Sequence, residues 1–288
     1  MRAPVGWFVG LATLDVVQRV DGFPAPNQKV VATDTWLAAG GPATNAAIAF
    51  AALGGRAVLW TALGAGAAAD VVRADLVGAG VELIDAAPPG FELAASSVLV
   101  DAATGERIVV SGSAHRPDFP AVTVPDLGDA QVLLVDGHHP PLALPAARAA
   151  ATRRLPIVVD AGSHKPVFNE LFPLASDVLC SADYVHPTGV EASALLEFGP
   201  QLVAVSHGSR PLQWWTTTAA GQVVPEPVEA QDTLGAGDVL HGAYAFALAA
   251  GTPRRAGLEF AVSAATRRVS TAGPFAWRAA LAGLVTGG

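Results

Sequence analysis

The sequence is poor in cysteine, in lysine and in charged residues as a whole. Its single cysteine, Cys180, excludes an internal disulfide framework and is typical of a chain that works in a reducing, cytoplasmic compartment. Lys29 and Lys165 are the only lysines, and charged residues make up 15% of the chain against 51% hydrophobic ones. This composition excludes an intrinsically disordered chain and predicts a folded one with a substantial core.

Basic clusters and long apolar runs are also absent. The 17 Lys and Arg residues are outnumbered by 25 Asp and Glu residues, and the formal net charge is -8. We therefore expect no nucleic-acid partner and no attraction to an anionic membrane. The Ala-rich stretch Ala46–Ala69 is interrupted by Gly54, Gly55 and Gly64, so it predicts a helix and a strand rather than a membrane span.

What the sequence does contain is a repeated alternation of short apolar strands with Ala- and Leu-rich helices. This alternation predicts one α/β domain over residues 1–288, with a mostly parallel central sheet covered by helices on both faces. After a first buried strand near Val5–Gly10, strands are predicted at Ala57–Leu63, Val132–Asp136, Pro156–Asp160, Asp177–Cys180 and Leu202–Ser206. Helices are predicted at Ala43–Leu53, Ala68–Ala79, Leu142–Arg153, Val190–Glu197, Asp238–Ala250 and Arg254–Thr271.

Two regions, roughly residues 13–39 and 92–114, interrupt this alternation. The first has little helical pattern and contains several turn-forming residues. The second contains Ser96–Asp101 and Glu106–Ser111 on either side of a short Gly-containing turn, which is the pattern of a β-hairpin. We expect both regions to lie outside the main sheet and to form a small β-strand lid over a site.

The segment Asp232–Asp238, with the sequence DTLGAGD, comes directly before a predicted helix. Gly235, Ala236 and Gly237 place closely spaced backbone N–H groups at the positive end of the helix dipole, an arrangement that suits phosphate oxygens. Asp238 in the first turn would hold its carboxylate beside a bound phosphoryl group and would accept a proton from an attacking hydroxyl. Taken alone, an acidic residue at this position is about equally consistent with a simple helix cap.

Two further segments place polar groups where ligands commonly bind. In GGPATN, Gly40 and Gly41 permit close approach of a ligand to the backbone, and Asn45 lies one turn into a helix, where its amide would bond a polyol. Asp15 follows the first buried strand, and ligands of open α/β sheets bind beyond the carboxyl ends of the strands. Each pattern alone is also consistent with a tight turn or a solvated polar side chain.

Together these segments resemble the ribokinase-like (PfkB) family of carbohydrate kinases over nearly the whole chain, and the DTLGAGD segment with the following VLHGA is the most specific match. The resemblance implies a Rossmann-like three-layer α/β/α domain with a small lid, ATP as donor, Mg²⁺, and a sugar or related alcohol as acceptor. It implies a general base at Asp238, an anion hole at Gly235, Ala236 and Gly237, and sugar contacts at Asp15, Gly40, Gly41 and Asn45.

The resemblance also implies residues for the nucleotide and for metal ions. Asp232, with the backbone near Gly273, falls where some members hold a monovalent cation such as K⁺. Asp136, at the end of a predicted strand, is the nominee for ordering Mg²⁺ through water, because Mg²⁺ usually keeps several waters. Lid edges in this family often pair across a dimer, which predicts a homodimer. The residues that fall at nucleotide contacts are Ser206, Gly208, Thr233 and Gly235.

The chain departs from the family pattern in ways that bear on the substrate. Ser181–Tyr184 stands in place of an Asn-x-x-Glu motif and is more similar to the ketohexokinase-like and sulfofructose-kinase-like branches, which favours a ketose. Pro211 stands where a glycine of the nucleotide loop is common. Lys29 and Arg116, near the predicted lid, are candidates for gripping an anionic group on the acceptor, although a solvated surface charge is the commoner explanation for such residues.

Two other functions are compatible with the sequence. Gly64-Ala65-Gly66 follows a strand, opens a helix and fits the loose dinucleotide fingerprint, so an NAD(P)-dependent oxidoreductase is one alternative. A non-catalytic sugar-binding relative is the other, and the intact Gly235–Asp238 segment argues against it. A Walker A loop is excluded, because neither lysine follows a glycine or precedes Ser or Thr.

Overall fold

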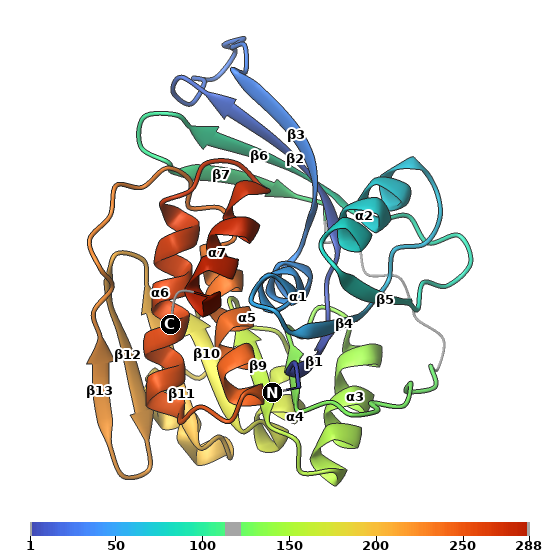
Figure 1. Ribbon diagram of the computed structural model, residues 1–288, viewed down its shortest axis with the longest axis vertical. Coiled ribbons are helices and arrows are strands. Elements are labelled where there is room, and N and C mark those ends of the chain that lie inside the picture. Colours follow the sequence, from blue (N-terminus) through green and yellow to red (C-terminus); the bar gives the residue numbers. More distant parts are fainter. Residues whose placement is uncertain (1, 113–121, 287–288) are drawn as a thin grey trace.

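The computed structural model describes residues 2–112 and 122–286, and its largest feature is a nine-stranded sheet (Figure 1). The strand order is β13-β12-β11-β10-β9-β8-β1-β4-β5, and all neighbouring pairs from β11 to β5 are parallel. Only β12 and β13, at one edge, pair antiparallel. The strands are β1 Val5–Val9, β4 Arg56–Thr61, β5 Val81–Asp85, β8 Val132–Val135, β9 Ile157–Ala161, β10 Asp177–Ser181, β11 Leu202–His207, β12 Arg210–Thr216 and β13 Ala220–Val223.

Helices cover both faces of this sheet. Successive side chains of β1 enter different cores, because Phe8 packs with the helices on one face while Trp7 and Val9 pack with those on the other. Burial on both faces explains why the parallel strands are apolar throughout. One face carries α1 Pro42–Ala52, α2 Ala67–Gly78, α5 Ala236–Ala249, α6 Arg254–Val269 and α7 Ala276–Thr286, and the other carries α3 Pro140–Thr152, α4 Phe168–Leu171, η1 Phe172–Leu174 and η2 Ala192–Phe198. The predicted three-layer α/β/α architecture is therefore confirmed.

A second, four-stranded sheet in the order β3-β2-β6-β7 lies at one end of the molecule, at the top of Figure 1. Because β2 begins at Thr13, soon after β1 ends at Val9, this sheet joins the carboxyl edge of the large sheet, where ligands bind in open α/β folds. The predicted hairpin is present as the antiparallel pair β6–β7. The strands are β2 Thr13–Val20, β3 Asp34–Gly40, β6 Ala95–Asp101 and β7 Arg107–Ser111.

The structure also corrects and extends the predicted elements. The helix predicted at Val190–Glu197 is a 3-10 helix at Ala192–Phe198, which ends at Gly199 with φ 126°. Strands β5, β12 and β13 and helix α7 were not predicted, and the two antiparallel strands at the sheet edge are only partly buried, so they lack a continuous apolar run. Among helices in the described residues, none has the length and apolar character to cross a bilayer.

Candidate active site

The DTLGAGD segment leads into α5 at the carboxyl edge of the large sheet. Gly235 immediately precedes the helix and adopts a left-handed conformation with φ 69°, so glycine suits this position. Asp238 lies in the first turn of α5, and its Oδ2 accepts a hydrogen bond of 2.8 Å from Nδ2 of Asn45 on α1. The two polar residues predicted from separate motifs, 193 positions apart in the chain, are therefore brought into direct contact.

Close packing of α1 against α5 produces this contact. A Cβ atom on Gly242 would lie 2.3 Å from the carbonyl oxygen of Ala46, so the two helix backbones touch at this point. Asn45 precedes Ala46 and Asp238 lies one turn before Gly242, which sets their side chains opposite each other. Gly41 is under a similar constraint, because its φ is 101° and a Cβ there would lie 2.3 Å from the carbonyl oxygen of Leu11.

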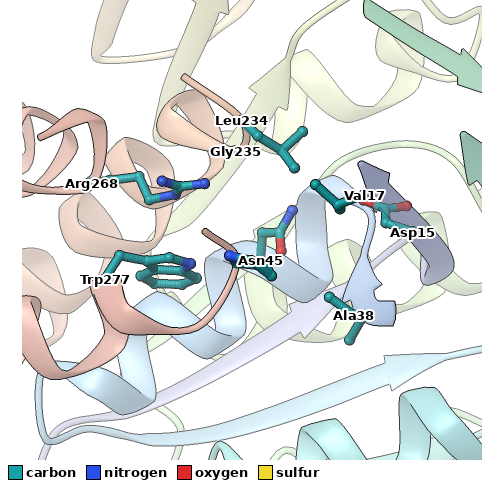
Figure 2. A pocket seen from close by; sticks show the side chains of 10 residues that line it. Asp15, Val17, Ala38, Asn45, Leu234, Gly235, Arg268 and Trp277 are labelled. Carbon is teal, nitrogen blue, oxygen red and sulfur yellow. The ribbon is translucent and has the colours of Figure 1, made fainter. Parts of the chain in front are cut away.

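A hollow opens beside this pair. Figure 2 shows Asp15, Asn45, Arg268 and Trp277 around it, contributed by β2, α1, α6 and α7. Burial raises the pKa of the Asp15 carboxyl, while hydrogen bonds from Thr13 and Ser96 oppose that shift. The lining residues are Asp15, Val17, Ala38, Ala39, Asn45, Leu234, Gly235, Arg268, Pro274 and Trp277.

The environment of Asp238 suits proton transfer near neutral pH. Burial raises the pKa of its carboxyl to about 7, and the negative charge of Asp160 adds to this shift. The hydrogen bond from Asn45 and the charges of His241 and Arg107 act in the opposite direction. A carboxyl with this pKa both releases and accepts a proton easily at physiological pH, as a general base must.

Behind Asp238 lies a buried ion pair that sequence reasoning missed. Nδ1 of His241 on α5 lies 2.8 Å from Oδ2 of Asp160 on β9, and each side chain is 5% exposed. Burial alone would raise the pKa of Asp160, but the charges of His241 and Lys165 hold it low. Burial alone would lower the pKa of His241, but Asp160 and Asp238 raise it. The available signal was the spacing, since His241 follows Asp238 by three positions and so shares its side of the helix.

The second sheet is bonded to the segment that precedes α5. The carbonyl oxygen of Gly105, in the β6–β7 turn, accepts hydrogen bonds from the backbone N–H (3.0 Å) and Oγ1 (2.9 Å) of Thr233. Nη1 of Arg107 on β7 donates to Oγ1 of Thr233 at 3.3 Å, and Nη1 of Arg19 on β2 donates to the carbonyl oxygen of Gln231 at 3.3 Å. Thr233, predicted as a nucleotide contact, thus connects the second sheet to the candidate anion hole.

Asp232, predicted as a monovalent-cation ligand, instead pairs with Arg268. Nη2 of Arg268 donates to Oδ2 of Asp232 at 2.9 Å, and both side chains are 2% exposed. The other carboxylate oxygen accepts the backbone N–H of Leu234 at 2.9 Å. Both carboxylate oxygens therefore have donors, and the residues around Asp232 do not fit a bound cation.

The Asp136 carboxylate is engaged with the backbone rather than open to a metal. It is 1% exposed and accepts hydrogen bonds from the backbone N–H groups of Leu11 (2.9 Å), Ala43 (3.1 Å) and His138 (2.9 Å). Its place in the structure is to join the ends of β1 and β8 to the start of α1. Within the described residues, no group of three or more His, Cys, Asp or Glu side chains is arranged to hold a metal ion. A contact from Asp136 to Mg²⁺ through water stays a prediction.

The remaining predicted residues lie at varied distances from the hollow. Ser206 is the last but one residue of β11, and its Oγ donates a hydrogen bond of 3.4 Å to the carbonyl oxygen of Cys180 on β10. Gly208 lies in the β11–β12 turn with φ 63°. Gly40 ends β3, directly against the Asp15 carboxyl. Lys29 is exposed in the loop between β2 and β3 and does not line the hollow, while Arg116 lies outside the described residues.

Comparison with known proteins agrees with the fold and identifies the family. The model of the pfkB family of carbohydrate kinases matches residues 7–276, so the chain belongs to this family. It is therefore a carbohydrate kinase, a phosphotransferase that transfers a phosphoryl group from ATP to a sugar. The ribokinase of Bacillus subtilis (strain 168) is 24% identical over 278 residues, covering 92% of each chain.

Solved structures show the same fold over almost the full length. A structure from Agrobacterium tumefaciens, provisionally assigned as a ribokinase, has a TM-score of 0.86 and 29% identity, and covers 99% of this chain and 97% of that one. A ribokinase from Arabidopsis thaliana, solved with ribose and ATP, has a TM-score of 0.77 at 20% identity, with 99% of both chains covered. A fructokinase from Xylella fastidiosa, solved with ATP, has a TM-score of 0.74 at 20% identity and covers 98% of both chains.

The family assignment and the hydrogen bonds of the Gly64–Gly66 loop both argue against the oxidoreductase alternative. The family match spans this loop, and side chains of the same chain bond to it. Oδ1 of Asp85 accepts the backbone N–H of Leu63 at 2.9 Å, and Nη2 of Arg73 donates to the carbonyl oxygen of Gly64 at 3.0 Å. Both ends of this contact set therefore bond the loop to neighbouring side chains of the same chain.

Proposed function

We propose that Asp238 is the general base of an ATP-dependent sugar kinase, and that the Gly235, Ala236 and Gly237 amides form its anion hole. The single observation that carries this proposal is the Asp238 carboxyl itself. It lies in the first turn of α5, is held by Asn45 at 2.8 Å, and has its pKa raised by burial to about 7. These properties suit a group that must be ionised before reaction and protonated after it.

The γ-phosphoryl group passes directly from ATP to the acceptor hydroxyl. Asp238 takes the proton of the acceptor hydroxyl as that oxygen attacks the γ-phosphorus of ATP. A new P–O bond forms to the sugar, the bond from the γ-phosphorus to the bridging oxygen breaks, and its electron pair leaves with ADP. The N–H groups at the start of α5 face the charge that spreads over the γ-phosphoryl oxygens, and the helix dipole adds to their effect.

The sugar occupies the hollow beside Asp238. Asp15 accepts hydrogen bonds from sugar hydroxyls, and the Asn45 amide orients both the sugar and the base. Trp277 supplies an apolar surface for the C–H face of the ring. The second sheet acts as a lid that excludes water, which limits the hydrolysis of ATP in the absence of an acceptor. Its bonds to Thr233 tie its position to that of the anion hole.

The substitution Asp238→Asn tests the proposed base. Because general-base catalysis contributes typically 10²–10⁴-fold, we expect turnover to fall on the order of 10²-fold or more. The measurement is ADP release coupled to sugar phosphorylation, with Asp126→Asn as the control, because Asp126 is exposed and precedes β8 at the opposite, amino edge of the large sheet. Near-normal turnover in a folded Asp238→Asn protein would refute the assignment.

The acceptor is proposed to be a ketose. The Ser181–Tyr184 segment supports this proposal through its similarity to the ketohexokinase-like branch. The competing acceptor is ribose, since the curated relative and the Arabidopsis thaliana structure are ribokinases. A panel of fructose, ribose, other aldoses, nucleosides and anionic sugars, compared by kcat/KM, decides between them. Preference for ribose would exclude the ketose, and use of anionic sugars with loss on Lys29→Ala would bring Lys29 into the site.

Two chains are proposed to pair through the outer strand of the lid. Strand β7 is the last strand of the four-stranded sheet in the described part of the chain, and it presents Ile108 (45% exposed), Val109 (45%) and Val110 (68%) to the surface. An exposed apolar edge strand offers both backbone hydrogen bonds and side chains to a partner, so a second copy of the same strand would cover it.

A further inference from the structure

The guanidinium of Arg268 is buried at the start of the DTLGAGD segment, where some members of the family hold a monovalent cation. Nη1 donates to the backbone carbonyl oxygens of Asp232 (3.3 Å) and Thr271 (2.9 Å), while Nη2 donates to Oδ2 of Asp232 (2.9 Å). A carboxylate and two carbonyl oxygens that converge on one positive charge are the type of ligand set that a hard cation takes. In this chain the positive charge on which these oxygens converge belongs to the Arg268 side chain.

The charges in this region disfavour the binding of a second cation. Asp232 and Arg268 already form a neutral pair, and each is 2% exposed, so an added ion would be a net positive charge in a poorly solvated place. Arg107 brings another positive charge close by. Burial lowers the pKa of Arg268, Asp232 opposes that shift, and the charge of Arg107 adds to it. Arginine nevertheless stays protonated at any working pH, so its charge is permanent.

The contacts of Arg268 connect it to the catalytic segment. It joins Asp232, the first residue of that segment, to Thr271, which lies in the turn between α6 and α7. Backbone hydrogen bonds from Gln231 (2.9 Å) and Asp232 (3.2 Å) to the carbonyl oxygen of Val269 run alongside it. The guanidinium also lies 5.9 Å from the ring of Trp277, which lines the hollow. Arg268 thus fixes the stretch from which the α5 amides project.

We propose that Arg268 is a built-in replacement for a monovalent cation, a positioning residue that orders the anion hole and makes the enzyme independent of K⁺. The inference rests on the proposed function for its link to catalysis, but the replacement itself is a property of the fold. Arginine suits this role because its planar fork bonds several oxygens at once in fixed directions. A lysine at the same place would supply the charge with fewer fixed contacts.

The first test uses the unmodified protein. Sugar phosphorylation and the thermal unfolding midpoint are measured with K⁺, Na⁺ or tetramethylammonium as the sole monovalent cation, at a constant ionic strength of about 0.1 M so that screening is equal. We expect the same kcat and the same midpoint with all three ions. Activation by K⁺ over tetramethylammonium of about tenfold, or a K⁺-specific rise of the midpoint, would overturn the proposal.

The second test removes the charge with Arg268→Ala, and Arg267→Ala, an exposed arginine of the same helix, is the matched control. We expect Arg268→Ala to lose kcat more than it raises KM, and to regain activity with K⁺ or with millimolar guanidinium but not with tetramethylammonium. Its midpoint is expected to fall by roughly 5 °C or more, because an unpaired carboxylate is left buried, and to rise again with K⁺. Arg267→Ala should behave as the unmodified protein does.

Absence of any cation-specific recovery in a folded Arg268→Ala protein would contradict the proposal, since a purely structural arginine leaves no cation site behind. If that variant does not fold, the cation series on the unmodified protein decides. The unfolding measurements need no sugar, so failure to find an acceptor would count against the proposed function alone, whereas a K⁺-specific rise in the midpoint of the unmodified protein would count against the role of Arg268 alone.

Discussion

At the scale of single residues, the site combines two carboxylates whose surroundings shift their pKa values in opposite directions. Burial and the charge of Asp160 raise the pKa of Asp238 to about 7. Asp160 stays ionised because His241, 2.8 Å away, balances the cost of its burial. Two nearby acids with different pKa values are a recurrent sign of divided roles in catalysis. In the proposed mechanism Asp238 carries the proton, and Asp160 sets the electrostatic field around it.

The raised pKa of Asp238 has a consequence for stability. Between its usual value of 3.8 and about 7, the folded protein binds a proton that the unfolded chain releases, so wild-type stability falls as pH rises through this window. The Asp238→Asn variant does not lose this stability, because asparagine does not titrate. Since the side chain is partly exposed, we expect a gain of only about 1–2 kcal/mol at pH 8, shrinking towards pH 4, in denaturant unfolding curves. An equal gain at both pH values would contradict this explanation, and the exposed control Asp126→Asn should show no gain.

The charge of Asp160 is also expected to set the acid limb of the pH–rate profile. Activity should be lost as pH falls below the pKa of Asp238, because the base becomes protonated. Asp160→Asn removes the charge that raises this pKa, and His241, without its partner, loses its own smaller and opposite effect. We therefore expect the acid limb of kcat/KM to move to lower pH. A limb that stays in place or moves to higher pH would show that Asp160 does not tune the base.

At the scale of elements, the crossing of α1 and α5 brings the two main residues of the proposed active site together. Neither helix carries a complete site, and Asn45 meets Asp238 only because the backbones touch at Gly242 and Ala46. The salt bridge between Arg278 on α7 and Asp75 on α2, at 2.6 Å and 3.0 Å, joins two further helices of the same layer. The layer is thus held by close packing at its centre and by an ion pair at its rim.

Gly242→Ala tests this crossing. The added Cβ would lie 2.3 Å from the backbone oxygen of Ala46, so the helices must separate, and we expect a loss of about 2–3 kcal/mol in stability together with a marked loss of kcat. Gly283→Ala is the control, because α7 has open space at that position. Removal of a helical glycine there should stabilise the protein by about 0.5–1 kcal/mol. Equal behaviour of the two variants in urea unfolding would refute the argument.

At the scale of the whole molecule, a small sheet is joined to a large one by a few polar contacts. Arg19, Gly105 and Arg107 of the second sheet all bond to Gln231 or Thr233, just before the anion hole. Strand β7, the edge strand that begins at Arg107, also exposes the apolar side chains of Ile108, Val109 and Val110 to the surface. The same strand therefore contacts the segment before α5 and carries the surface proposed to pair with a second chain.

Val110→Lys tests the pairing of two chains. A lysine on an edge strand opposes pairing because its charge would have to be buried against its own copy. We expect the unmodified protein to be a dimer in sedimentation velocity and the variant to be a monomer. Val77→Lys on α2 is the matched control, since Val77 is 71% exposed and Val110 is 68% exposed. A monomeric unmodified protein, or dissociation by Val77→Lys as well, would exclude this interface.

The layered α/β architecture could be predicted from the sequence, because strands buried on both faces must be apolar throughout and the helices between them carry Ala and Leu. The same holds for the DTLGAGD and GGPATN segments, because a phosphate cradle needs glycines and a helix start that are local in the chain. Helix α7 and the edge strands β12 and β13 were missed, and the edge strands, being half-buried, leave no continuous apolar run.

The pairing of charges, in contrast, depends on the folded structure. Asp160 and His241 are 81 positions apart, and Asp232 and Arg268 are 36 apart, so no local pattern pairs them. Asp136, a metal candidate by its place at a strand end, turned out to accept three backbone N–H groups. Asp232, a cation ligand by resemblance, turned out to hold an arginine. Coulomb interactions act through space and depend on burial, and packing alone sets both the distance and the burial.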